Sequence, residues 1–72
     1  MQYLVVIEKG DNNYSAYLPD LPGCVATGRT PEETFQQIVK AVDMHIKGLM
    51  EDGLSVPEPK AKAEYLNLQQ AS

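Results

Sequence analysis

Residues 14–28, YSAYLPDLPGCVATG, decide the fold of this chain. Pro19 fixes its own φ angle and lacks a backbone N–H, so it ends the strand that precedes it. The Pro22-Gly23 pair reverses the chain, because Gly23 is free to adopt a positive φ. Asp20 is placed to accept hydrogen bonds from its own loop, as aspartates in turns do. The stretch therefore predicts two short strands joined by a stiff bend with an acidic tip.

Composition limits the chain to one domain and a small set of functions. Its 72 residues allow a single domain, residues 1–72. Asp and Glu outnumber Lys and Arg by 10 to 6, which gives a net charge of −4. This balance argues against direct binding to nucleic-acid phosphates, which requires clustered Lys and Arg. The negative charge either attracts a basic protein partner or serves solubility alone.

The single cysteine, Cys24, and the single histidine, His45, exclude an internal disulfide and argue against a four-ligand zinc site. No cofactor or metal is implied. Since so short a chain buries only a thin core, association with another subunit is the expected source of additional stability. The chain has no apolar run of about 18 residues and no leader peptide, so we expect no membrane contact. Together with the lone thiol, this predicts a cytoplasmic protein.

A helix over residues 31–52 is the clearest secondary-structure signal. Thr30 is a good N-cap, Pro31 suits the first helical position, and Glu33 completes a capping box. Gly53 is expected to end the helix in the left-handed conformation. The other expected elements are strands at about 3–8, 14–18, 24–28 and 63–68, and a connector at 54–62. The last of these strands is ambiguous, because its Ala and Glu also favour a helix.

The order of elements, β-β-β-α-β, predicts an α+β fold. Residues 3–8 carry apolar side chains on both faces, which favours a central strand. A right-handed crossover through the helix would place the last strand parallel to the first, giving the sheet order 3-2-1-4. One helix covers only one face, so the other face should form an apolar interface in a homo-oligomer, a dimer or tetramer, or with another protein. The expected oligomer-interface residues are Leu4, Val6, Tyr14 and His45.

These motifs together make the chain resemble the HicB-like antitoxin family. The resemblance rests on YSAYLPDLPGCVATGRTPEE, on MHIKGLMEDG at the end of the helix, and on the VPEP that follows. It implies a truncated ribonuclease-H-like fold and a non-catalytic antitoxin, which binds and neutralises HicA, a small mRNA-cleaving toxin. Many members also carry a C-terminal DNA-binding domain. Only Gln69-Gln70-Ala71-Ser72 follow Leu68 here, so we expect no direct DNA binding by this chain.

The reactive side chains do not form a catalytic pattern. A ribonuclease-H-type nuclease needs several carboxylates that converge on metal ions, whereas Glu8 and Glu64 are isolated on their strands. A nucleophilic cysteine needs a base, and nothing in the sequence places His45 beside Cys24. We therefore expect no enzyme activity.

Tyr14 and Tyr17 point to opposite faces of their strand, so one should pack under the helix and the other should be available to a partner. The acidic bend is a turn, and with an exposed Leu21 it would also suit docking to a basic toxin. The expected partner-binding residues are Tyr17, Asp20, Leu21 and Pro22. The alternative function is a solitary homo-oligomeric module that binds a protein or ligand without a cognate toxin.

Overall fold

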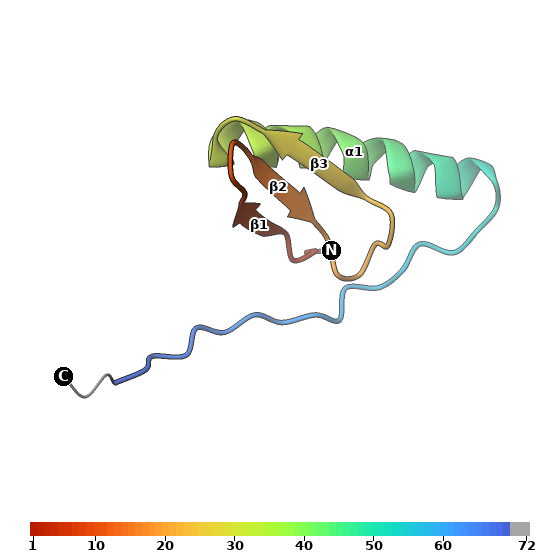
Figure 1. Cartoon of the computed structure of the whole chain (residues 1–72). Helices are drawn as coiled ribbons and strands as arrows, with labels where there is room; N and C mark the ends of the chain where they lie inside the picture. The colour runs from red at the N-terminus through yellow and green to blue at the C-terminus, as the bar shows by residue number, and fades with distance from the viewer. Residues whose placement is uncertain (70–72) are drawn as a thin grey trace.

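Three antiparallel strands precede one long helix in the computed structural model, which describes residues 1–69 (Figure 1). The strands are β1 (Val6–Lys9), β2 (Tyr14–Tyr17) and β3 (Val25–Gly28), and the helix is α1 (Pro31–Glu51). The sheet order is β1-β2-β3, so β2 is the central strand. The predicted α+β class is confirmed, as are the first three strands and the helix.

Thr30 caps the start of α1 and Gly53 follows its end in the left-handed conformation, as the sequence predicts. At the start, the Thr30 hydroxyl accepts a hydrogen bond from the Glu33 amide at 3.0 Å, and Pro31 occupies the first turn. At the end, Gly53 adopts a φ of +69° and donates its amide to the Met50 carbonyl at 3.1 Å. The Leu54 amide donates to the Leu49 carbonyl at 2.9 Å, which completes a Schellman motif.

The helix covers one face of the sheet, and the strand register shows which side chains lie beneath it. Ile7, Ala16 and Ala26 are directly opposite one another across the three strands, and all three belong to the core or pack against it. Ile38 of α1 is completely buried against this face. The fully buried apolar residues are Ala16, Leu18, Leu21, Cys24 and Ile38.

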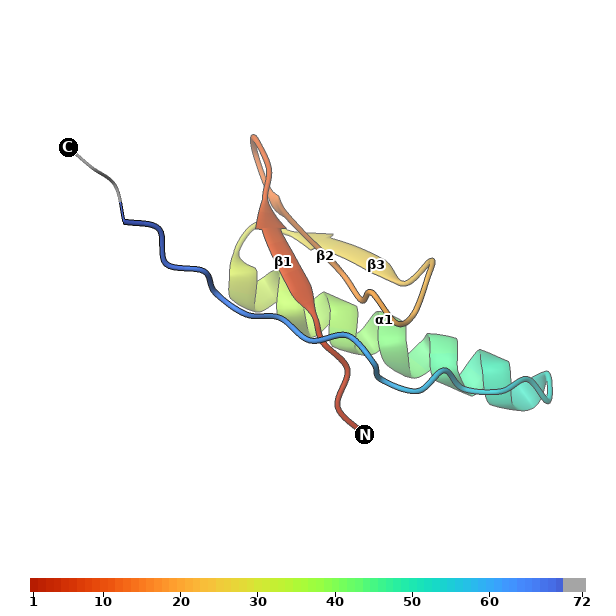
Figure 2. The ribbon, with the colours of Figure 1, turned by 90° about the horizontal axis from the view of Figure 1, so that it is seen from below.

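The predicted fourth strand is wrong for this chain on its own. Among residues 1–69 no strand follows α1. Residues 54–69 run as an extended segment that passes below β1 in the view of Figure 1 and then away from the sheet (Figures 1 and 2). The sheet order therefore lacks its fourth member. The expected central position of residues 3–8 is also wrong: β1 begins at Val6 and lies at the edge, because no other segment of residues 1–69 pairs with its outer side.

Candidate functional site

The face of the sheet opposite α1 is left uncovered by the part of the chain that the structure describes. Val6, Tyr17 and Val25 are directly opposite one another on this face, with Tyr17 40% exposed and Val25 66% exposed. Glu8 is the only charged side chain of the strands that faces this side, through its register with Ser15 and Thr27. Leu4 continues the same alternation before β1. We call this surface the open face: an apolar centre with an acidic residue toward one end.

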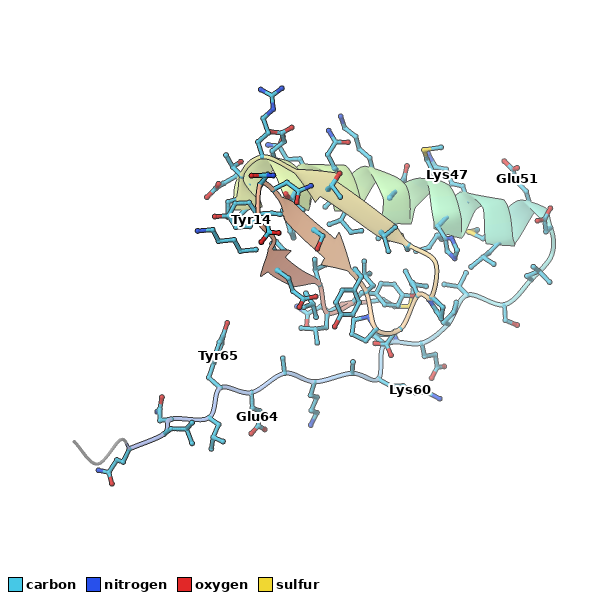
Figure 3. The ribbon with its side chains drawn as sticks, viewed as in Figure 1. Tyr14, Lys47, Glu51, Lys60, Glu64 and Tyr65 are labelled. Carbon is cyan, nitrogen blue, oxygen red and sulfur yellow. The ribbon has the colours of Figure 1, made fainter. Side chains whose placement is uncertain are left out.

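The two tyrosines of β2 lie on opposite sides of the sheet, as predicted. Tyr14 pairs with Lys9 and Gly28 on the helix side, where it is half-buried near the start of α1 (Figure 3). Tyr17 lies on the open face. The structure therefore separates the expected interface residues: Leu4 and Val6 belong to the open face, whereas Tyr14 belongs to the helix side.

The bend between β2 and β3 closes the core instead of projecting a free tip. The Leu21 amide donates to the Leu18 carbonyl at 3.1 Å, and the Cys24 amide donates to the Leu21 carbonyl at 3.2 Å. Gly23 takes a φ of +85°, as its position after Pro22 requires. These turns direct Leu21 inward, where it is 1% exposed. The expectation of an exposed Leu21 is thus wrong, because the bend needs an apolar side chain to cover the end of the core.

The Asp20 carboxylate is hydrogen-bonded to backbone amides of its own chain. One carboxylate oxygen, Oδ2, accepts hydrogen bonds from the backbone amides of Lys60 and Ala61, each at 3.0 Å. A second contact lies nearby in sequence: the Tyr3 hydroxyl donates to the carbonyl of Pro57. These contacts fasten the segment after α1 to the bend and to the residues before β1. Of the four expected partner-binding residues, only Tyr17 and Pro22 remain exposed.

Cys24 and His45 border the same hollow, which the sequence did not indicate. Both line a shallow hollow between the start of β3 and α1, with Val25 and Met44 at its rim. Burial raises the pKa of the Cys24 thiol above its ordinary value of 9.0. A thiol that stays protonated is a poor nucleophile, so Cys24 is a packed core residue and not an activated nucleophile.

Other reactive groups are dispersed. Within residues 1–69, no three His, Cys, Asp or Glu side chains approach closely enough to hold a metal ion. Glu8 lies on β1, whereas Glu64 extends from the segment after α1 (Figure 3). Nor does the described part of the chain contain a helix with the length and apolar character needed to cross a lipid bilayer.

The contacts of Asp20 and Tyr3 with the C-terminal segment are the functional features that sequence reasoning missed. Asp20 lies 41 positions before Ala61, and Tyr3 lies 54 positions before Pro57. An aspartate in a turn and a tyrosine in an apolar strand each have an ordinary local role, so neither carries a signal for a partner so distant in sequence. The extended, proline-containing segment at residues 56–59 was the only hint that this region needs external anchoring.

A family model and several related proteins match this sequence and agree on one family. The sequence matches the family model described as the HicB-like antitoxin of bacterial toxin–antitoxin systems over residues 3–71. A 14.9 kDa protein from the rep-hol intergenic region of Haemophilus phage HP1 is 34% identical over 67 residues, which cover 93% of this chain. The chain spans half the length of that phage protein. A UPF0150 protein of Helicobacter pylori is 40% identical over 50 residues, 69% of each sequence.

The fold also matches a solved structure. A chain of the HicA3 and HicB3 toxin–antitoxin complex is similar with a TM-score of 0.69 and 32% sequence identity. The match covers 82% of this chain and 70% of that chain.

Proposed function

This chain belongs to the HicB-like antitoxin family, and from that membership we propose that it binds and neutralises a small, basic, mRNA-cleaving toxin of the HicA type. The family is non-catalytic, so the protein acts by binding and not by chemistry. Its mechanism is occlusion: the antitoxin covers the surface with which the toxin engages RNA.

The observation that carries the proposal is the similarity to a chain of a toxin–antitoxin complex. The similarity spans 82% of this chain at 32% identity, so it extends over most of the sheet and helix and is not confined to one motif. The net charge of −4 supports the same pairing, because an acidic antitoxin and a basic toxin attract one another before they make contact.

We place the toxin contact on the open face, around Tyr17 and Val25. Tyrosine suits such a contact because it brings a large apolar ring and a polar tip at little entropic cost. Asp20 and Leu21 do not take part, since Asp20 is engaged by Lys60 and Ala61 and Leu21 is buried. The bend instead holds β2 and β3 in the arrangement that presents Tyr17.

Co-expression with a HicA-type protein from the same genome tests the proposal. We expect the two proteins to purify as a complex, and we expect co-expression to relieve the growth arrest that the toxin causes. Tyr17→Ala should weaken binding at least tenfold, about 1.4 kcal/mol, as removal of a central interface tyrosine does. Val39→Ala is the matched control, because Val39 is 49% exposed but lies on α1, away from the open face.

Two results would contradict the proposal. Absence of both a complex and growth rescue would overturn the antitoxin function and favour the solitary homo-oligomeric module. Equal binding of the Tyr17→Ala and Val39→Ala variants would leave the antitoxin function standing but remove the toxin contact from the open face.

A further inference from the structure

Residues 62–69 form an arm that the other described residues, 1–61, leave uncovered. Every residue in it is exposed, with Tyr65 at 100%, Leu66 at 83% and Leu68 at 76%. The arm is extended, and Figure 3 shows Glu64 and Tyr65 projecting in opposite directions. Strand alternation therefore places Leu66 and Leu68 on the side of Glu64, opposite Tyr65. This is the alternation of a strand with apolar side chains on both sides, yet no other segment among residues 1–69 pairs with it.

Hydrogen bonds hold the residues just before the arm, and they direct the arm away from the sheet of its own chain. The two hydrogen bonds from the Lys60 and Ala61 amides to Asp20 hold the chain at the bend, at the end of the sheet where β3 begins. Beyond this point both views show the arm running clear of β1 (Figures 1 and 2). As a result the radius of gyration is 14.9 Å, compared with about 11 Å for a compact domain of this length.

The same chain carries an unpaired sheet edge. The Gly10 amide donates to the Asn13 carbonyl at 2.7 Å, and antiparallel hydrogen bonding alternates from that point along β1 and β2. By this alternation, the backbone amide and carbonyl of Glu8 bond to β2. The backbone amides and carbonyls of Ile7 and Lys9 point away from β2, toward the open edge of the sheet. An open row of backbone donors and acceptors is a template for an additional strand.

A shallow apolar hollow lies directly beside that edge. It is formed between β1 and the first turns of α1, and its apolar members are Ile7, Pro31 and the 47% exposed Phe35. A strand added to β1 would direct alternate side chains into this hollow. Leu66 and Leu68, which are on one side of the arm, have the spacing and the character to fill it.

We propose that residues 63–68 of one copy pair with the β1 edge of a second copy, and that the exchange is reciprocal. A second copy is the occupant because it supplies both an arm of the required pattern and an edge of the required geometry. Exchange around a twofold axis pairs both arms with both β1 edges, which closes the assembly as a dimer. The fourth strand that the sequence predicts is then present in the sheet, supplied by the neighbouring chain. This inference does not depend on a toxin.

Disulfide cross-linking between two different variants tests the exchange directly. Both carry Cys24→Ala; one adds Glu8→Cys on β1, and the other adds Tyr65→Cys or Asn67→Cys on the arm. Since the two cysteines are on separate chains, a disulfide between them requires contact between copies. We expect a cross-linked dimer from at least one of the mixtures, and none when Asp43→Cys on the outer side of α1 replaces Glu8→Cys. No product across chains, together with an internal disulfide in a chain that carries both cysteines, would overturn the proposal.

Light scattering on the unmodified chain and on two proline variants provides a second test. We expect the unmodified chain to have twice the mass of a single copy at micromolar concentration. Leu66→Pro removes a strand amide and should weaken dimerisation at least tenfold, whereas Gln69→Pro, just beyond the paired segment, should not. Far-UV circular dichroism should show α1 intact in both variants, because the arm does not contribute to the core. A monomeric unmodified chain, or equal effects of the two prolines, would overturn the proposal.

Discussion

Asp20 and Ala61 are joined across the chain: the Asp20 carboxylate oxygen Oδ2 accepts the Ala61 amide at 3.0 Å, 41 residues further along the sequence. The same oxygen accepts the Lys60 amide at 3.0 Å. One side chain in the bend between two strands therefore sets the direction in which the C-terminal arm leaves the fold. The main structural role of the acidic bend is therefore to position the segment after α1.

Loss of the Asp20 carboxylate should release the base of the arm. Asp20→Ala should raise the hydrogen-exchange rates of the Lys60 and Ala61 amides at least tenfold, about 1.4 kcal/mol, because both lose a charge-assisted acceptor. Asp20→Asn should have a smaller effect, since an acceptor oxygen remains. Asp11→Ala, in the exposed loop between β1 and β2, is the control and should leave both amides unchanged. Equal exchange in all three variants would show that the arm is held by other contacts.

Gly28 should not tolerate a side chain. A Cβ at this position would lie 2.8 Å from the Thr34 amide nitrogen and 3.0 Å from the Thr34 Cα, which are backbone atoms of α1 that cannot easily move. We expect Gly28→Ala to lower the free energy of unfolding by about 2 kcal/mol, as overpacking of a close contact does. Urea denaturation followed by circular dichroism measures this change, and unaltered stability would show that β3 and α1 can separate.

Gly48 provides the opposite case within α1. A Cβ there would meet no atom within 4 Å, so Gly48→Ala should stabilise the chain by about 1 kcal/mol through helix propensity alone. No close packing contact therefore requires a glycine here among the residues that the structure describes. A loss of stability in the same urea titration would contradict this prediction. Such a loss would indicate that Gly48 contacts another subunit.

The buried Cys24 thiol should make stability sensitive to alkaline pH. Burial raises the pKa of this thiol above 9.0 in the folded chain, so folding favours the neutral form. Its contribution is present below the pKa of the unfolded chain and is lost as the pH rises through the folded pKa. The free energy of unfolding should therefore fall more between pH 7 and pH 10 for the unmodified chain than for Cys24→Ala. Parallel losses in the two proteins would rule out this contribution.

Much of the fold follows from signals that lie within a few residues of one another. Thr30 and Glu33 define the start of α1, and Gly53 defines its end, because capping depends only on adjacent backbone groups. Pro22 and Gly23 define the turn between β2 and β3 for the same reason. The opposite orientation of Tyr14 and Tyr17 follows from strand alternation alone.

Other features depend on which parts of the chain meet. Alternation cannot tell which of the two tyrosines faces the helix; that depends on how α1 packs against β3. Leu21 looked like an exposed tip residue because the turn chemistry is the same whether the turn points inward or outward. The fourth strand was predicted from an alternating pattern, yet none forms among residues 1–69, because a pattern does not specify the strand with which a segment pairs.

The sequence by itself determined the three strands, the bend and the capped helix, since each depends on local backbone preferences and on the period of apolar side chains. Only the tertiary structure decided that Leu21 closes the core, that Asp20 holds Lys60 and Ala61, and that β1 is left as an open edge. These contacts join residues that are distant in sequence. Their free energy depends on the distances and burial that exist only after the sheet and helix have packed together.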